Sequence, residues 1–476
     1  MMTIDNQKTD AEGATSAPSV RWVLAGLSLS MLLSSLGTSI ANVALPTLAQ
    51  AFNASFQDVQ WIVLAYLLAI TTLIVSVGRL GDIVGRRRLL LAGILLFTVA
   101  SVLCGIAPNV WLLIAARALQ GLGAAAMMAL TMAFVGGTVP KEKSGSAMGL
   151  LGAMSAIGTA LGPSLGGVLI ATLDWRAIFL VNLPLGLAAF VLAWRALRAD
   201  GARAAADRPG FDVLGTLLLA LTLGAYALAM TLGRGHFGSL NGALLLVAAL
   251  GVVVFVAVER RAASPLVRLT MFADVRLSAG LAMSVLVATV LMGTLVVGPF
   301  YLAHALGLNA AVVGMVLSVG PLVVALTGVP AGRIADRFGA QRMTVAGLVA
   351  IAAGCFMLSA IPATSGIPGY LAPIVVVTLG YALFQTANNT SVMADVPADR
   401  RGVISGLLNL SRNLGLVTGA SVMGAVFAFA AAARDITTAA PQAVAGGMRI
   451  TFAVAGVLIV AALAIAMAGQ TRAARG

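Results

Sequence analysis

Apolar runs long enough to cross a membrane, separated by short polar breaks, fill the chain from residue 22 to residue 468. A transmembrane helix needs about 20 consecutive apolar residues, whereas the strands of a membrane β-barrel are about 10 residues long and alternate in polarity. The pattern therefore predicts an all-α polytopic membrane protein. The 14 predicted helices cover 22–46, 58–79, 88–107, 110–138, 145–172, 176–196, 213–233, 240–258, 277–303, 308–330, 343–361, 370–394, 402–431 and 449–468.

The composition excludes a soluble fold. Of the 476 residues, 60% are hydrophobic and 9% are charged, and the mean hydropathy is +1.03. A soluble domain cannot bury so much apolar surface, and the 53 glycines suit closely packed transmembrane helices. The two cysteines, Cys104 and Cys355, lie in apolar runs without the spacing of metal ligands. We expect neither a metal site nor a disulfide.

The net charge of +13 reflects topology. Placing the N-terminus in the cytoplasm leaves only four of the 29 Lys and Arg residues in outer loops, as the positive-inside rule requires. The sequence therefore predicts a multi-pass protein of the cell inner membrane with both termini cytoplasmic. A nucleic-acid partner is not expected.

Two internal matches reveal a repeat. The segment from Gly78 to Arg88 recurs 254 positions later at 332–342, and five of the seven glycines between 145 and 167 recur with an offset of 257. Parallel repeats of this kind are a signature of transporters, which bind substrate where the two halves meet. The predicted regions are a disordered tail (1–20), a six-helix bundle (21–197), two linker helices with cytoplasmic loops (198–275), a second six-helix bundle (276–470) and a short cytoplasmic tail (471–476).

Two glycine-rich segments are candidates for moving parts. In the predicted loop 78–88, glycines permit a sharp turn and Asp82 can pair with an arginine or a helix N-terminus, although the arginines alone would also anchor the loop at the membrane surface. In the fifth predicted helix, glycines four residues apart allow a close crossing and Pro163 bends the helix; a purely structural crossing is the alternative. The candidate gating residues are Gly78, Asp82, Gly85, Arg86, Gly158, Gly162, Pro163, Gly166, Gly167 and Asp336.

These motifs are similar to those of the major facilitator superfamily, and most closely to its 14-helix drug:proton antiporter branch. The matching segments are 42–46, 78–88, 117–123, 158–167, 175–186, and Pro265-Leu266 with Phe272. The resemblance implies two bundles that alternate in access and a cavity lined by predicted helices 1, 2, 4, 5, 9, 10, 12 and 13. One position departs from the branch: Gly37 stands where an acid is usual. None of the 16 acidic residues lies well inside a predicted helix.

Two arginines, in contrast, lie inside predicted helices. Arg117 is in the fourth and Arg412 is near the middle of the thirteenth, where a charge is costly and needs a partner or water. Three interpretations stay open: Arg117 is structural, Arg117 takes part in proton coupling as the family motif implies, or both arginines attract an anionic substrate. The third interpretation predicts that permanent cations are disfavoured. The candidates for proton coupling are Arg117, His304 and Asp82.

Polar and aromatic residues on the expected cavity helices are candidate substrate ligands, although buried amides can also simply bridge helices. The predicted cavity residues are Asn42, Tyr66, Arg117, Gln120, Tyr301, Gln385, Asn388, Asn389, Asn409, Arg412 and Asn413.

We predict a secondary active transporter that exports small organic molecules of the multidrug or antibiotic type, driven by the proton gradient. A uniporter or importer of an organic anion or metabolite is one alternative, and a lipid flippase is another. No ATP-binding loop, metal cluster or nucleophile with its base is present in the sequence, so we expect no enzyme and no cofactor. The expected partners are the substrate, protons and membrane lipids, with the protein acting as a monomer.

Overall fold

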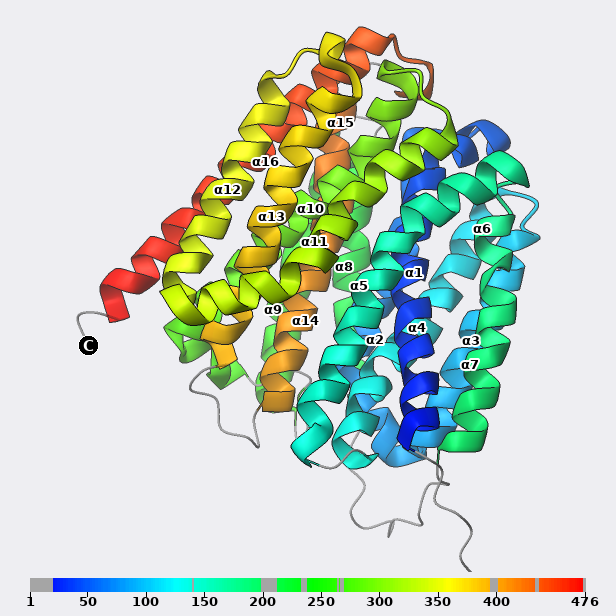
Figure 1. The fold of residues 1–476 in the computed structure, drawn as a ribbon, viewed down its shortest axis with the longest axis vertical. Coiled ribbons are helices and arrows are strands. Elements are labelled where there is room, and N and C mark those ends of the chain that lie inside the picture. The colour runs from blue at the N-terminus through cyan, green and yellow to red at the C-terminus, as the bar shows by residue number, and fades with distance from the viewer. Residues whose placement is uncertain are drawn as a thin grey trace, which may run out of the picture.

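The computed structural model describes residues 20–138, 141–197, 212–232, 238–262, 265, 269–393, 401–432 and 436–473. Within these ranges the ordered elements are helices without a strand (Figure 1). The bounds are α1 Val20–Phe52, α2 Phe56–Val84, α3 Arg86–Gly105, α4 Val110–Thr138, α5 Lys141–Thr172, α6 Ala177–Leu180, α7 Asn182–Ala196, α8 Val213–Thr231, α9 Ser239–Arg261, α10 Val275–Phe300, α11 Ala310–Phe338, α12 Ala340–Ala360, α13 Gly366–Met393, α14 Arg401–Thr418, α15 Gly424–Ala430 and α16 Pro441–Ala473. Two π-helical turns, η3 Tyr301–Ala305 and η5 Gly419–Met423, extend α10 and join α14 to α15.

The predicted all-α fold with 14 spans is confirmed: the described residues contain 14 helical segments long and apolar enough to cross a membrane. Helices α6 and α7 form one span, as do α10 with η3 and α14 with η5 and α15. The number of spans was predictable because each apolar run has to be about as long as the membrane is thick.

The two bundles repeat one packing scheme. In the first, α1 packs on α5, α2 on α4, and α3 on α4 and α7. In the second, α10 packs on α14, α11 on α13, and α12 on α13 and α16. Figure 1 shows α1–α7 on the right and α10–α16 on the left, with α8 between them.

The predicted loop after the second helix is an interrupted helix in the structure. Helix α2 continues to Val84, the Gly85 backbone N–H donates to the Gly81 carbonyl at 3.0 Å, and α3 begins at Arg86. The break is one residue long because Gly85 has φ 107°, which glycine adopts without a steric penalty. The repeat copies this feature at Gly339, with φ 89°. The prediction of a loop was therefore wrong.

The two ends of the molecule differ in charge. We call the end where α2 meets α3 and α11 meets α12 the Arg-rich end; its described arginines include Arg86, Arg87, Arg88, Arg195, Arg260, Arg261, Arg276, Arg333, Arg337 and Arg342. We call the other end, where α1 meets α2 and α10 meets α11, the opposite end. Helix α1 starts at the Arg-rich end, and α16 finishes there.

Among the described residues, the buried core that contains side chains of both bundles lies toward the opposite end. One buried cluster contains side chains of both bundles, and within it Phe56 of α2 contacts Phe300 of α10 and Phe427 of α15, with ring centroids 4.8 and 5.7 Å apart. The other two clusters each belong to one bundle: one consists of residues 23–197 and the other of residues 277–410. The bundles are thus fused at one end and packed separately toward the other.

Small residues make the contact between α5 and α11 close. A side chain at Gly167 of α5 would meet the Ala310 carbonyl of α11 at 2.6 Å, and one at Gly314 of α11 would meet Gly167 and the Pro163 carbonyl. The neighbouring motif glycines serve a different helix pair: Gly158, Gly162 and Gly166 let α5 approach α1 within the first bundle. Of the motif in α5, Gly167 is the glycine whose added Cβ would meet the second bundle.

Helix α8 covers the seam between the bundles on another side. It pairs antiparallel with α2 through hydrogen bonds near both ends: Trp61 Nε1 donates to Thr231 Oγ1 at 3.0 Å, and the Ser76 and Thr216 hydroxyls bond at 2.9 Å. Between these points, Tyr226 of α8 reaches the hydroxyls of Thr418 and Ser421 in the second bundle. Helix α8 therefore contacts both bundles.

Candidate functional site

The structure contains two adjoining cavities, of about 260 and 130 Å³: the larger lies where the bundles meet, and the described walls of the smaller all belong to the second bundle. Both are lined by Ala288, Tyr381, Gln385 and Arg412, so they form one continuous interdomain cavity. The larger part lies between α5 and the helices α10, α11, α13 and α14, and most of its walls are apolar. The smaller part lies toward the Arg-rich end, and its polar walls include Ser284, Asn389 and Asn409.

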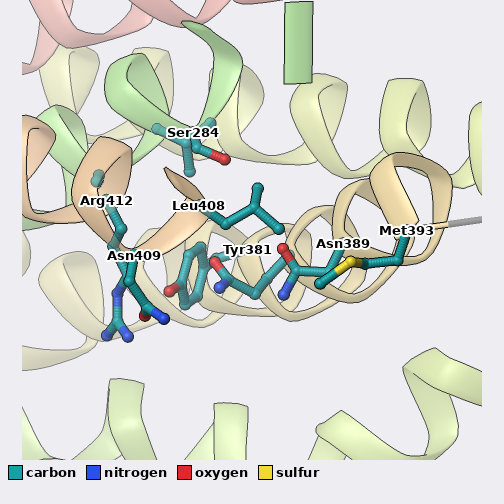
Figure 2. Close-up of a pocket in the computed structure, with 10 residues that line it drawn as sticks. Ser284, Tyr381, Asn389, Met393, Leu408, Asn409 and Arg412 are labelled. Atoms are coloured by element: carbon teal, nitrogen blue, oxygen red, sulfur yellow. The ribbon is translucent and has the colours of Figure 1, made fainter. Parts of the chain in front are cut away.

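Arg412 stands at the junction of the two parts. It comes from α14, is half-buried, and no hydrogen bond or ion pair joins it to another described residue. Figure 2 shows Arg412 and Asn409 beside Tyr381, with Asn389 and Met393 further along α13. Of the residues predicted for the cavity, the structure brings together Gln385, Asn389, Asn409 and Arg412.

The environment of Arg117 is the opposite of that of Arg412. It is 0% exposed, and its guanidinium donates to the Ile62 carbonyl at 3.0 Å, the Gly37 carbonyl at 3.0 Å and Gln120 Oε1 at 2.5 Å. The Tyr66 ring lies 4.1 Å from Arg117 Cζ, in the geometry of a cation–π contact. This network links α4 to α1 and α2 inside the first bundle, which is the arrangement expected of a structural arginine.

The partners of Arg117 are anchored in turn. Gln120 donates to Ser101 Oγ of α3 at 2.6 Å, and Tyr66 donates to the Ser34 carbonyl of α1 at 2.8 Å. Asn42 is also fully buried, and its amide donates to the Thr38 and Ser39 carbonyls of its own helix. The structure therefore places these predicted cavity residues in the interior of the first bundle and away from the cavity walls.

The remaining predicted residues lie around the second bundle. Asn388 bridges α13 to α10 by donating to Ser284 Oγ and the Gly280 carbonyl. Tyr301 stacks on Tyr370, a residue of the cavity wall, at a centroid distance of 5.9 Å, so Tyr301 lies behind that wall. Asn413 is buried on α14 outside both parts of the cavity.

The proposed titrating and gating groups are spread over both ends. His304 lies in η3 at the opposite end, where it stacks on Phe300. Arg86 starts α3 at the Arg-rich end. The side chains of Asp82 and Asp336 and the surroundings of Gly78 lie outside the described residues.

No described carboxylate lines the cavity. The acidic residues whose side chains are described are Asp58, Asp174, Asp212, Glu259 and Asp274, and none of them belongs to its walls. Among them, Glu259 lies in the last turn of α9 and is only 3% exposed. It lies beside the first turn of α8.

Sequence reasoning missed several residues of the wall. Ser155 and Thr159 of α5, and Tyr370, Thr378 and Tyr381 of α13, face the larger part of the cavity. The repeat offset could have found Ser155, because it is the equivalent of Arg412 in the first bundle. The tyrosines carry no such signal, since aromatic residues also occur at lipid-facing and core positions of membrane helices.

The chain is similar to known membrane transporters. The sequence pattern described as Major Facilitator Superfamily matches residues 27–420. The multidrug resistance protein Stp of Mycobacterium tuberculosis is 34% identical over 414 residues, which cover 85% of this chain and 75% of that protein. The tetracenomycin C resistance and export protein of Streptomyces glaucescens is 33% identical over 428 residues, covering 88% of this chain and 78% of that protein.

Among solved structures, a bacterial homologue of the human lysosomal transporter Spinster has the same fold. The two structures superpose with a TM-score of 0.70 at 14% sequence identity, covering 96% of this chain and 98% of the other. At this identity the likeness concerns the fold alone.

Proposed function

The chain belongs to the major facilitator superfamily, and from this premise we propose that it exports small organic molecules by alternating access of its interdomain cavity. The proposal draws on the relatives, whose names describe multidrug resistance and the export of tetracenomycin C. It also draws on the cavity itself, which lies between the bundles in the position typical of transporters built from parallel repeats.

The observation that carries the proposal is the unequal packing at the two ends. The bundles share one buried core at the opposite end and have separate cores toward the Arg-rich end. Packed cores are bistable and resist gradual deformation, so a rigid rotation of one bundle against the other is the natural way to exchange these arrangements. In the present arrangement, the cavity is closed at the opposite end by the contact of Gly167 with Gly314 and by the Phe56 cluster.

We infer the orientation in the membrane from the charge distribution. Basic residues accumulate on the cytoplasmic side of membrane proteins, and in a bacterial inner membrane the Arg-rich end would therefore face the cytoplasm. The present arrangement would then be the inward-facing one, ready to load substrate from the cytoplasm or the inner leaflet. The outward-facing arrangement would release it after the contacts at the opposite end separate.

We propose the proton gradient as the energy source, with His304 and Asp82 as the titrating candidates. Arg117 is the weaker candidate of the three, because its donors are already committed to carbonyl and amide oxygens of the first bundle. The lack of a described carboxylate in the cavity wall favours one alternative, a carrier that equilibrates its substrate without proton antiport.

Transport by purified protein in proteoliposomes tests both the proton-driven exporter and the carrier without proton antiport. Vesicles are loaded with an anionic or a cationic fluorescent probe, and probe movement is followed with an imposed pH gradient and after nigericin has collapsed it. The proposal expects movement that the gradient accelerates and that protein-free vesicles lack. Movement at the same rate without a gradient would establish the uncoupled carrier, and no movement of any probe would contradict export.

A further inference from the structure

We infer that the interdomain cavity binds amphipathic organic anions, with the anionic group at Arg412 and the apolar body in the larger part of the cavity. The inference rests on the proposed transport function and gives its substrate a chemical class. Three features of the described residues carry it: an uncompensated cation, amide groups beside it, and an apolar space that begins at the same side chain.

The first of these features is the cation, Arg412 of α14. Arg412 has no hydrogen bond or ion pair with another described residue, and the five described carboxylates lie outside the cavity walls. A charge within a membrane span is costly unless a partner or water compensates it. Because described side chains do not provide the counter-charge, a bound anion would stabilise this site, whereas a bound cation would be repelled.

The polar surroundings suit an anionic group of carboxylate shape. Gln385, Asn389 and Asn409 line the smaller part of the cavity together with Arg412. The amide groups of Gln385 and Asn389 offer N–H donors, and the planar guanidinium offers donors that match a carboxylate in a bidentate manner. The amides are neutral, so they orient a ligand without offsetting the positive charge.

The apolar body has its own space. Leu291, Leu295, Leu317, Val324 and Ile374 contribute apolar walls to the larger part of the cavity, which Tyr370 closes on one side. The two parts measure about 260 and 130 Å³ and adjoin at Arg412, and together they reach the size of small-molecule pockets, roughly 300–1,000 Å³. A ligand with an aromatic body and one anionic group can therefore occupy both parts at once.

The internal repeat shows that the positive charge is confined to one side. The equivalent of Arg412 in the first bundle is Ser155, which faces the same cavity and bonds the Ser35 hydroxyl of α1 at 2.7 Å. Arg117 does not add to the cavity charge, because it is enclosed in the first bundle. Among the described residues that line the cavity, Arg412 is therefore the one cation, and we expect it to decide the sign of the charge preference.

A pair of probes with the same body and opposite charge tests the inference. Dansylglycine is an anion, and dansylamidoethyl-trimethylammonium carries a permanent positive charge. Binding of each to the purified full-length protein is measured from the dansyl fluorescence, and transport of each is measured in proteoliposomes. The wild-type protein should bind dansylglycine at least tenfold more tightly, because a hydrogen-bonded charge contributes about that factor or more.

Variants at one position separate charge from shape. Arg412→Gln should weaken dansylglycine binding at least tenfold and leave binding of the cation unchanged or tighter, while Arg412→Lys should bind dansylglycine with an affinity between those of the wild type and Arg412→Gln, because the charge remains but the bidentate hydrogen bonding is lost. Arg333→Gln, which removes an exposed arginine at the Arg-rich end, is the matched control and should change neither affinity.

The outcomes distinguish the substrate class from the transport function. A wild type that binds and transports the cationic probe in preference overturns the inferred class and leaves export intact. Equal weakening of both probes by Arg412→Gln also overturns it, since the residue would then act through shape. If neither probe binds or moves, the inferred class and the proposed function both fail.

Discussion

Two arginines inside membrane spans have opposite surroundings in this molecule. Arg117 is enclosed by carbonyl oxygens, an amide and an aromatic ring of the first bundle, whereas Arg412 faces an interdomain cavity without a described partner. Both have to meet the cost of a charge in an apolar setting. Hydrogen bonds within the first bundle compensate the charge of Arg117, whereas water or a ligand has to compensate the charge of Arg412. An intramembrane arginine thus becomes a candidate binding residue when the surrounding protein leaves it unsatisfied.

The largest expected effect is the loss of stability on replacing Arg117. Arg117→Met removes three hydrogen bonds and leaves Gln120 and two carbonyls without a donor, which we expect to lower the free energy of unfolding by at least about 3 kcal/mol. Arg412→Met breaks no described bond and should stay within about 0.5 kcal/mol of the wild type. Thermal unfolding of both variants in the same detergent measures the difference, and equal destabilisation would remove the contrast between the two sites.

These same residues show which features of the structure could be predicted from the sequence and which could not. The spans and the repeat were predictable, because run length and recurring glycines are local features of the chain. The positions of Arg117 and Arg412 relative to the cavity were not, because hydropathy does not tell which helix face meets a neighbouring helix when lipid-facing and core positions are both apolar. The one-residue break at Gly85 was hidden for a similar reason, since a glycine fits a loop and a helix end equally well.

A second prediction introduces an acid at Gly37, the position at which the sequence departs from the branch that it resembles. The Gly37 carbonyl accepts a bond from Arg117, and a side chain there would meet the Tyr66 hydroxyl at 2.9 Å and the Phe97 ring at 3.2 Å. Gly37→Asp should therefore destabilise the bundle by about 1–3 kcal/mol through overpacking. Gly37→Ala is the control with the same Cβ. If the aspartate variant is more stable than the alanine variant, Arg117 has room for an ion pair, and the description of its network as complete is wrong.

A third prediction adds charge to the cavity. Ser155→Arg places a second cation opposite Arg412 and removes one hydroxyl bond to Ser35, so it should lower stability by no more than about 1 kcal/mol. Dansylglycine binding should tighten severalfold, and binding of the dansyl cation should weaken. Ser155→Gln, of intermediate size and neutral, controls for bulk. A variant that binds both probes less tightly than Ser155→Gln would indicate that the cavity does not select by charge.

The smallest effect is expected at the rim of the Arg117 network. Ser101→Ala removes the acceptor of the Gln120 amide, which should cost about 1 kcal/mol because one buried donor loses its partner. Thr98→Ala, one turn earlier on α3, removes a hydroxyl that bonds only its own helix and serves as the control. Equal unfolding temperatures for the two variants would show that the hydrogen bond between Gln120 and Ser101 contributes nothing to stability.

The central claim is that the bundles exchange one closed end for the other around the cavity that contains Arg412. Spin labels at two pairs of positions measure this directly: Val84 with its repeat equivalent Phe338 at the Arg-rich end, and Leu173 with Phe429 at the opposite end, all exposed. The buried Cys104 and Cys355 are first replaced by alanine. When a transported probe is added, the account predicts a shorter distance within the first pair together with a longer distance within the second. Distances that stay fixed under transport conditions, or that change in the same direction at both ends, would contradict it.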